Sequence, residues 1–242
     1  MKRRFLAFSI IAALAAALPV LAGDPAPGTW SSSLGLSYVK TSGNSDTSTG
    51  GFDFAFKRTP NPWGIEGMAS YLQADSAGET TAERWKAGLR GTRALHERWQ
   101  VFLGGTAEQD LYSGIRHRYV GETGATFTAL AGPKNELYLD TGLTYTQEKY
   151  TSNEKDDFMG GLLGLKYAYN FSKTSQFLQR LAYFPNFSQS SNWRLESETA
   201  VKAALTDHMA LKAGVNVRRT NEPPPGFKRT DTTTAVSLVF TF

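Results

Sequence analysis

The sequence predicts an all-β fold, an antiparallel up-and-down transmembrane β-barrel of about 12 strands. Three observations support this prediction. After Trp30 the chain consists of segments of roughly 10 to 13 residues in which apolar and polar residues alternate. The connections between these segments alternate between short and longer ones, and aromatic residues gather at the segment ends. This combination is typical of barrels of the bacterial outer membrane.

Period-two alternation defines the strands, and the last segment shows it most clearly. In TTTAVSLVFTF, Val236, Leu238 and Phe240 share one face, while Ser237 and Thr241 lie on the other. The same pattern predicts strands at residues 30–40, 49–58, 63–74, 83–94, 99–110, 116–130, 136–150, 157–171, 175–185, 193–205, 209–220 and 232–242. Alternation alone fits a secreted sandwich or a lipocalin-like barrel as well as a membrane barrel.

The connections and the aromatic residues favour the membrane barrel. TPNP, HER, AGPK, SKT and TDH are short, whereas the intervening loops are mostly longer, as expected for periplasmic turns and external loops. Trp30 and Tyr38 share a face eight residues apart, and so do Trp63 and Tyr71. Eight tilted strand residues span about 20 Å, close to the roughly 25 Å apolar band between two aromatic girdles.

The two ends of the chain carry export and assembly signals. Lys2, Arg3 and Arg4 precede an apolar run that is too short for a transmembrane helix, so residues 1–22 are predicted to be a signal peptide. Residues 23–29 would form a short periplasmic segment, and residues 30–242 the barrel. Phe240 and Phe242 resemble the C-terminal assembly signal of outer-membrane proteins, which the insertion machinery reads.

Composition excludes several classes of function. The chain has no cysteine, which rules out disulfides, zinc–thiolate sites and thiol nucleophiles. Without the three basic residues of the signal, 23 Lys and Arg face 22 Asp and Glu, a net charge of +1 that does not favour nucleic acid. The histidines His96, His117 and His208 stand alone, without a paired ligand or a nucleophile. We therefore expect no enzyme, cofactor or metal.

Charged residues on the inward face mark the candidate site. Alternation places Glu108 and Asp110 inward on one strand, and Arg116 and Arg118 inward on the next. Two interpretations remain open for this lumen charge cluster. It is either a structural salt-bridge network that fills a narrow lumen, which we favour, or a charge pair that gives a solvated pore its selectivity. A barrel of about 12 strands lies between the filled and the open size classes.

Two motifs resemble a known family. One is TSGNSDTS after the strand WSSSLGLSYVK; the other is EQDLYSGIRHRYVGETG, with Glu108, Asp110, Gly114, Ile115 and Arg118. They are similar to a family of uncharacterised bacterial outer-membrane proteins that includes one described as a salt-induced outer membrane protein. The resemblance implies a barrel in the cell outer membrane, but no activity. Within TSGNSDTS, which is chiefly an external turn, Asn44 and Asp46 are the candidate contact residues.

We therefore expect an integral outer-membrane barrel with a role in envelope, osmotic or salt stress and no catalytic activity. The alternative is a narrow diffusion channel for small charged solutes. The expected partners are outer-membrane lipid, lipopolysaccharide and the outer-membrane insertion machinery, with no nucleic acid. We expect the barrel to be a monomer.

Overall fold

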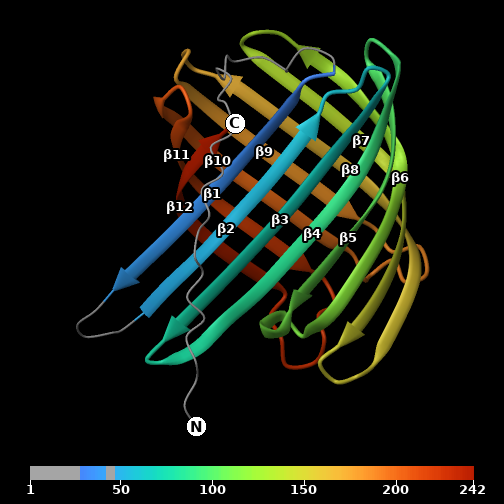
Figure 1. Ribbon diagram of the computed structural model, residues 1–242. Helices are drawn as coiled ribbons and strands as arrows, with labels where there is room; N and C mark the ends of the chain where they lie inside the picture. Colours follow the sequence, from blue (N-terminus) through green and yellow to red (C-terminus); the bar gives the residue numbers. More distant parts are fainter. Residues whose placement is uncertain (1–27, 42–46) are drawn as a thin grey trace.

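A computed structural model describes residues 28–41 and 47–242, which form one closed antiparallel barrel of 12 strands (Figure 1). The strands are β1 Trp30–Thr41, β2 Thr47–Arg58, β3 Trp63–Ser76, β4 Glu79–His96, β5 Trp99–Asp110, β6 Ile115–Ala131, β7 Asn135–Tyr150, β8 Lys155–Asn170, β9 Ser175–Phe184, β10 Arg194–Thr206, β11 Met209–Thr220 and β12 Thr230–Thr241. Each strand pairs with the next along the chain, and β12 pairs with β1. The predicted fold class is confirmed.

The predicted strands match the observed ones except for small differences at their ends. The largest lies in DSAGETTA, which was expected to be a loop between strands ending at 74 and starting at 83. In the structure the connection is only Ala77 and Gly78, whose φ angles are 51° and 81°. Two consecutive residues with positive φ make a tight hairpin turn. The polar residues on either side therefore pair as strand, and β3 and β4 are longer than predicted.

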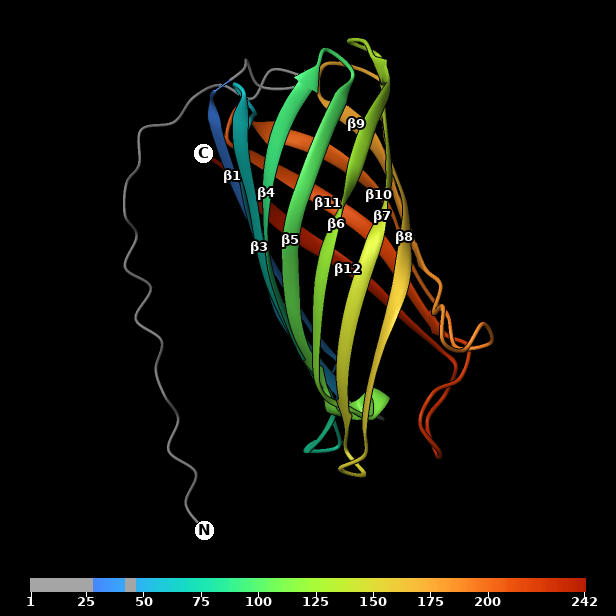
Figure 2. The same ribbon diagram turned by 90° about the vertical axis from the view of Figure 1, so that its right-hand side faces the viewer.

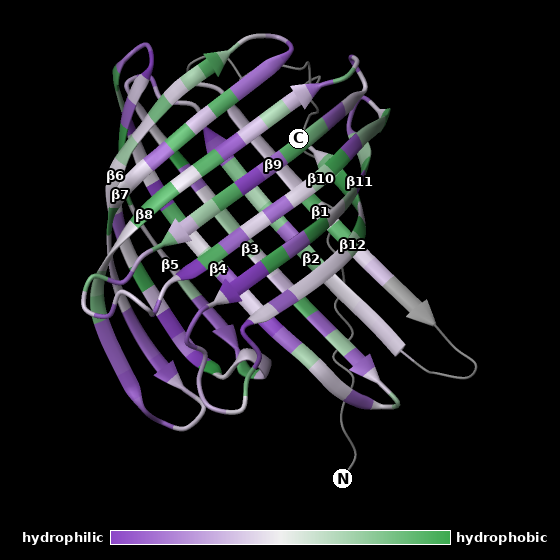
Figure 3. Cartoon of the chain, turned by 180° about the vertical axis from the view of Figure 1, so that it is seen from behind, coloured by the Kyte–Doolittle hydropathy of each residue, from purple (hydrophilic) through white to green (hydrophobic). Residues whose placement is uncertain are grey.

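The apolar face of the barrel points outward. Trp63, Leu103 and Leu163 are all more than half exposed although they are large and apolar. Figure 3 shows hydrophobic and hydrophilic residues alternating along the strands around the wall. In water such a surface would aggregate, whereas in a bilayer the acyl chains cover it. Trp30 and Tyr38 are exposed on this same outward face, as expected for two aromatic girdles.

The two ends of the barrel differ. One end carries the short turns, such as residues 97–98 and 207–208. The other carries the longer connections 185–193 and 221–229, together with the 3₁₀ helix η1, Leu111–Ser113 (Figure 2). No helix in the part of the chain that the structure describes is long and apolar enough to cross a membrane. We refer below to the turn end and the loop end.

The last residues of the chain close the barrel. Register pairs from Ser33–Thr241 to Ser37–Ser237 join β1 to β12. Phe242 and Ser32 exchange two backbone hydrogen bonds, of 2.9 and 3.0 Å. Phe240 lies opposite Leu34 on the lipid-facing side. The predicted signal peptide, Asn44 and Asp46 lie outside the described residues.

Deleting Phe242 should impair assembly. The deletion removes both backbone hydrogen bonds at the seam and an outward aromatic side chain. We expect less of the folded, heat-modifiable form on gels of outer-membrane fractions, with more of the unfolded form. Phe171→Ala serves as the control, because Phe171 is also an exposed phenylalanine and lies in a turn, away from the seam. Equal assembly of the deletion variant and the wild type would contradict the assembly-signal prediction.

Candidate functional site in the barrel lumen

Eight charged side chains that face the lumen form one connected set of ion pairs, which we call the outer network because it lies toward the loop end. The set joins four cations to four anions: Lys86, Arg118, Arg194, Arg218, Glu108, Asp110, Glu148 and Glu196. Its members come from β4, β5, β6, β7, β10 and β11. The network therefore draws on both halves of the barrel wall.

Arg118 occupies the centre of the outer network. It donates from Nε to Glu148 Oε1 at 2.5 Å, and its Nη1 donates to Glu108. All three side chains are at least 94% buried. Tyr150 donates its hydroxyl to the second oxygen of Glu148, at 2.8 Å. A buried charge is tolerated only where partners of this kind compensate its desolvation.

Two sets of ion pairs cross the lumen. Lys86 on β4 donates to Glu196 on β10, with Nζ to Oε2 at 3.0 Å. Arg218 on β11 pairs with Asp110 on β5, with Nη1 to Oδ2 at 2.7 Å, and with Glu108 at 3.3 Å. In a ring of 12 strands, β4 and β10 are opposite, and so are β5 and β11. The side chains of facing walls therefore meet at this level.

The motif EQDLYSGI builds one corner of the network. Asp110 caps η1, because its carboxylate accepts from Ser113 N at 3.1 Å. Gly114 follows with φ 81°, a left-handed conformation that glycine adopts without strain. A Cβ there would also lie 2.8 Å from the ring of Phe227. The tight turn thus leads β5 directly into β6 and holds Asp110 beside Arg218.

The loop 221–229, which connects β11 to β12, reaches across the loop end of the barrel. On one side Asn221 donates its side-chain amide to the carbonyl of Ser191, at 2.8 Å. On the other side Phe227 lies against Gly114. Pro223 and Pro224 line the same small pocket as three arginines of the outer network. The loop thus lies above the network as a cover.

A second cluster lies nearer the turn end, on one side of the wall. Arg90 pairs with Glu122 at 2.8 Å and with Asp140 at 3.2 Å. Its guanidinium stacks on the ring of Phe102, with the centroid 4.1 Å away. Gly124 makes room for that ring, because a Cβ there would lie 2.7 Å from Phe102. These contacts line the wall of β4 to β7 and do not cross the lumen.

Water reaches the remaining part of the lumen. The side chain of Arg180 faces inward, paired to Glu198 at 3.7 Å, yet it is 70% exposed. Lys166 is 40% exposed although it pairs with Asp140. Asp53 on β2 is also exposed. The lumen charges are therefore mostly buried toward the loop end and more exposed from the middle of the barrel toward the turn end.

Of the four residues of the predicted charge cluster, the structure brings three together: Glu108, Asp110 and Arg118. Arg116 differs from the prediction. The register shifts between Ile115 and His117, so Arg116 is the extra residue of a bulge. It makes no ion pair with any residue in the described part of the chain. Strict alternation cannot anticipate this, because a bulge interrupts the period.

Five members of the network lie outside the predicted charge cluster: Lys86, Glu148, Arg194, Glu196 and Arg218. Glu148 and Arg194 were not assigned to the cluster, although Glu148 lies eight residues after Asp140 and is therefore in the same phase.

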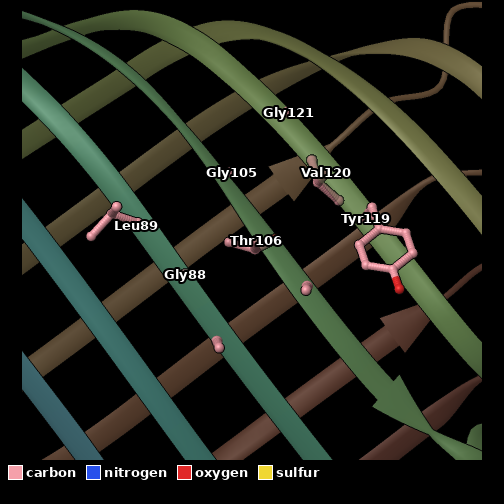
Figure 4. A pocket seen from close by; sticks show the side chains of 9 residues that line it. Gly88, Leu89, Gly105, Thr106, Tyr119, Val120 and Gly121 are labelled. Carbon is pink, nitrogen blue, oxygen red and sulfur yellow. The ribbon is translucent and has the colours of Figure 1, made fainter.

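Among the described residues no group of three or more His, Asp or Glu side chains is placed to hold a metal ion. A shallow hollow lined by Leu89, Gly105 and Tyr119 lies on the lipid-facing wall rather than in the lumen (Figure 4).

A family model described as "Protein of unknown function, DUF481" matches residues 34–242. The chain belongs to this family. Within curated proteins, the DUF481 chain is 27% identical over 208 residues to the uncharacterized protein YdiY of Escherichia coli K12, covering 85% of this chain and 80% of YdiY. The predicted resemblance to a family of uncharacterised proteins is thus supported. Neither description mentions salt.

Two solved structures are similar to the DUF481 barrel. The outer membrane channel of Pseudomonas putida F1 superposes with a TM-score of 0.51 at 11% identity, covering 91% of this chain and 98% of that one. The NanC porin superposes with a TM-score of 0.48 at 10% identity, covering 87% and 97%. The Pseudomonas channel shows that the fold is that of an outer-membrane barrel.

Arg118→Gln should destabilise the barrel strongly, and Arg116→Gln should not. Removing Arg118 leaves Glu108 and Glu148 with fewer partners in a buried site, which costs about 3–5 kcal/mol. Arg116 lies two residues away on the same strand without an ion pair, so its change should stay within about 0.5 kcal/mol. Urea unfolding in lipid vesicles measures both. Equal midpoints for the two variants would contradict the central role of Arg118.

Proposed function

We propose that the protein is a non-catalytic barrel of the outer membrane whose lumen is closed at rest, and that it supports the envelope under osmotic or salt stress. The closed lumen is supported by two ion pairs that cross it, Lys86 with Glu196 and Arg218 with Asp110. Because these contacts join facing walls, a solute at this level meets bonded side chains instead of a water-filled path.

The energetic argument concerns the buried charges of the outer network. A passing ion would have to separate Lys86 from Glu196, or Arg218 from Asp110. The charges of the separated side chains would then be only partly compensated. Breaking a fully buried ion pair on one side costs several kcal/mol, and these partly buried pairs cost less than that to separate. Permeation requires binding that is weak enough to release the solute again. The network therefore favours a barrier over a selectivity filter.

The absence of catalysis in this proposal rests on where the histidines lie. His96 and His208 are at the turn end, next to the hairpins 97–98 and 207–208. His117 stacks on Tyr119 on the outer wall, with ring centroids 6.3 Å apart. None of the three reaches the lumen charges. A general base beside a nucleophile, which hydrolases need, is therefore not assembled among these residues.

The stress role rests on the resemblance to the salt-induced outer membrane protein, and a closed barrel is compatible with it. A barrel without an open path adds a rigid element to the membrane and no leak of ions. The proposed location follows from the outward apolar wall and from the outer-membrane fold. We propose a monomer, because one chain closes the barrel by itself.

A narrow diffusion channel for small charged solutes is the second candidate. The exposed inward side chains of Arg180, Lys166 and Asp53 support it, because they show a hydrated lumen toward the turn end. In this candidate function the outer network is a gate whose ion pairs across the lumen separate transiently. The two functions differ in the resting state of the lumen.

Conductance across a planar bilayer distinguishes them. The wild type should stay at the closed baseline. The double change Lys86→Met with Glu196→Gln replaces both members of one crossing pair and leaves no charge without a partner. Channel openings should therefore appear. Lys212→Met with Glu198→Gln is the control, because this pair joins the neighbouring strands β10 and β11. A wild type that conducts steadily at rest would overturn the closed lumen and favour the channel.

The stress role predicts an envelope defect in cells without the protein. After a shift to high salt, such cells should survive less well and release more periplasmic enzyme than the parent strain. The wild-type chain should restore survival, and the unstable Arg118→Gln chain should restore it only in part. Unchanged survival and leakage after deletion would contradict this role without bearing on the closed lumen.

A further inference from the structure

The outer wall carries a group of basic side chains at the loop end of β6, β7 and β8, which we call the basic patch. It consists of His117, Lys149 and Lys155. His117 lies opposite Lys149 in the β6–β7 register, and Lys149 lies opposite Lys155 in the β7–β8 register. Directly opposite residues of paired strands point to the same face. The three side chains therefore project together from adjacent strands.

This face is the lipid-facing one. The ring of His117 stacks on that of Tyr119, which is 51% exposed. Tyr119 projects from the outer side of β6 in Figure 4. Tyr145 and Met159, which are opposite each other further along β7 and β8, are also exposed on this wall. The basic patch thus continues directly into an apolar surface.

The two lysine charges of the basic patch have no ion-pair partner within the described part of the chain. Neither lysine nor His117 forms an ion pair there, in contrast to the lumen cations Lys86 and Lys212. Two lysines directly opposite each other destabilise a strand pair. The arrangement is therefore unfavourable for the isolated barrel, and an anion bound between the side chains would relieve it.

The acids nearest to the patch form no ion pair with it in the described part of the chain. Asp157 lies on the same face, but it accepts from the Tyr145 hydroxyl at 3.1 Å. Glu154 is in the adjoining loop and accepts from Ser152 at 3.1 Å. On the other side of η1, the outward face of β3 and β4 carries Glu83, bonded to Tyr71 at 3.4 Å. An anion at the loop end would therefore prefer β6–β8 to β3–β4.

The position of the basic patch along the barrel axis suggests which kind of anion it binds. His117 is two residues beyond Tyr119, or about 7 Å along the strand toward the loop end. Interfacial aromatic residues lie at the head-group level of a bilayer, so the patch lies where lipid phosphates are found. Below it, Leu143 and Leu163 are more than half exposed and offer an apolar wall. A ligand with phosphate groups above and acyl chains below fits both parts.

We propose that the basic patch binds the phosphate groups of a phosphorylated saccharide lipid of the outer leaflet, whose acyl chains lie against Tyr119, Tyr145 and Met159. Lysine ammonium groups suit phosphate as point charges, and the adjacent tyrosines suit the boundary between head group and chains. This inference rests on the outer-membrane location in the proposed function and is independent of whether the lumen is closed.

Native mass spectrometry of the full barrel in detergent tests the proposal with diphosphorylated lipid A as the probe. The wild type should bind it, and Lys149→Gln with Lys155→Gln should bind it roughly thirtyfold more weakly, because each basic residue at an anionic surface contributes about fivefold. Lys134→Gln with Lys173→Gln is the matched control. It removes the same charge from turns 132–134 and 171–174 at the opposite end of neighbouring strands and should bind like the wild type.

Three outcomes would overturn the proposal. One is equal binding by the wild type and the Lys149 and Lys155 double variant while the double variant keeps its heat-modifiable folded form. Another is equal binding of lipid A from which the phosphates have been removed, which would show that the acyl chains alone suffice. The third is full displacement of the lipid by an equal concentration of inorganic phosphate, which would show a simple anion site.

Discussion

The structure depends on the compensation of charge inside the barrel. Arg118 is enclosed by Glu108 and Glu148, which come from the two neighbouring strands, so the β5–β6–β7 register must place all three at one level. A slip by one residue would turn each of these side chains toward lipid. The ion pairs therefore stabilise the register, and the register gives the ion pairs their geometry.

The same constraint divides the lumen into two parts. In the outer half, the charges of opposite walls neutralise one another, and Val120, Phe158 and Leu162 fill the space beside them. Toward the turn end, Arg180 and Asp53 are exposed, so water solvates charges that protein partners compensate in the outer half. A barrel of 12 strands is of intermediate width, wide enough for water yet narrow enough for long side chains to meet. How far side chains obstruct a lumen of this width therefore depends on which of them face inward as well as on strand number.

Much of this could be predicted from the sequence, and the limits have physical causes. Alternation gave the number of strands, the faces and the inward position of Glu108, because lipid and lumen impose a strict period of two. It could not give the contact between Lys86 and Glu196. Strand order shows which walls are opposite, but the stagger of the strands decides which residues share a level. It also failed at Arg116, where one extra residue in a bulge changes the phase, and at the hairpin of Ala77, where polar residues pair as strand.

Lysines on the lumen-facing and lipid-facing sides of the wall differ in the counterion that their surroundings offer. Lys86 faces the lumen and has Glu196 within 3.0 Å, so its charge is compensated by the protein itself. Lys149 and Lys155 face outward and lie opposite each other, with no ion pair in the described part of the chain. A soluble protein could leave such lysines to water. A membrane barrel holds them against a layer of lipid head groups, where phosphates are the counterions at hand. With the proposed lipid bound, the interior network and the exterior patch are two solutions to one electrostatic problem, the first supplied by the chain and the second by the membrane.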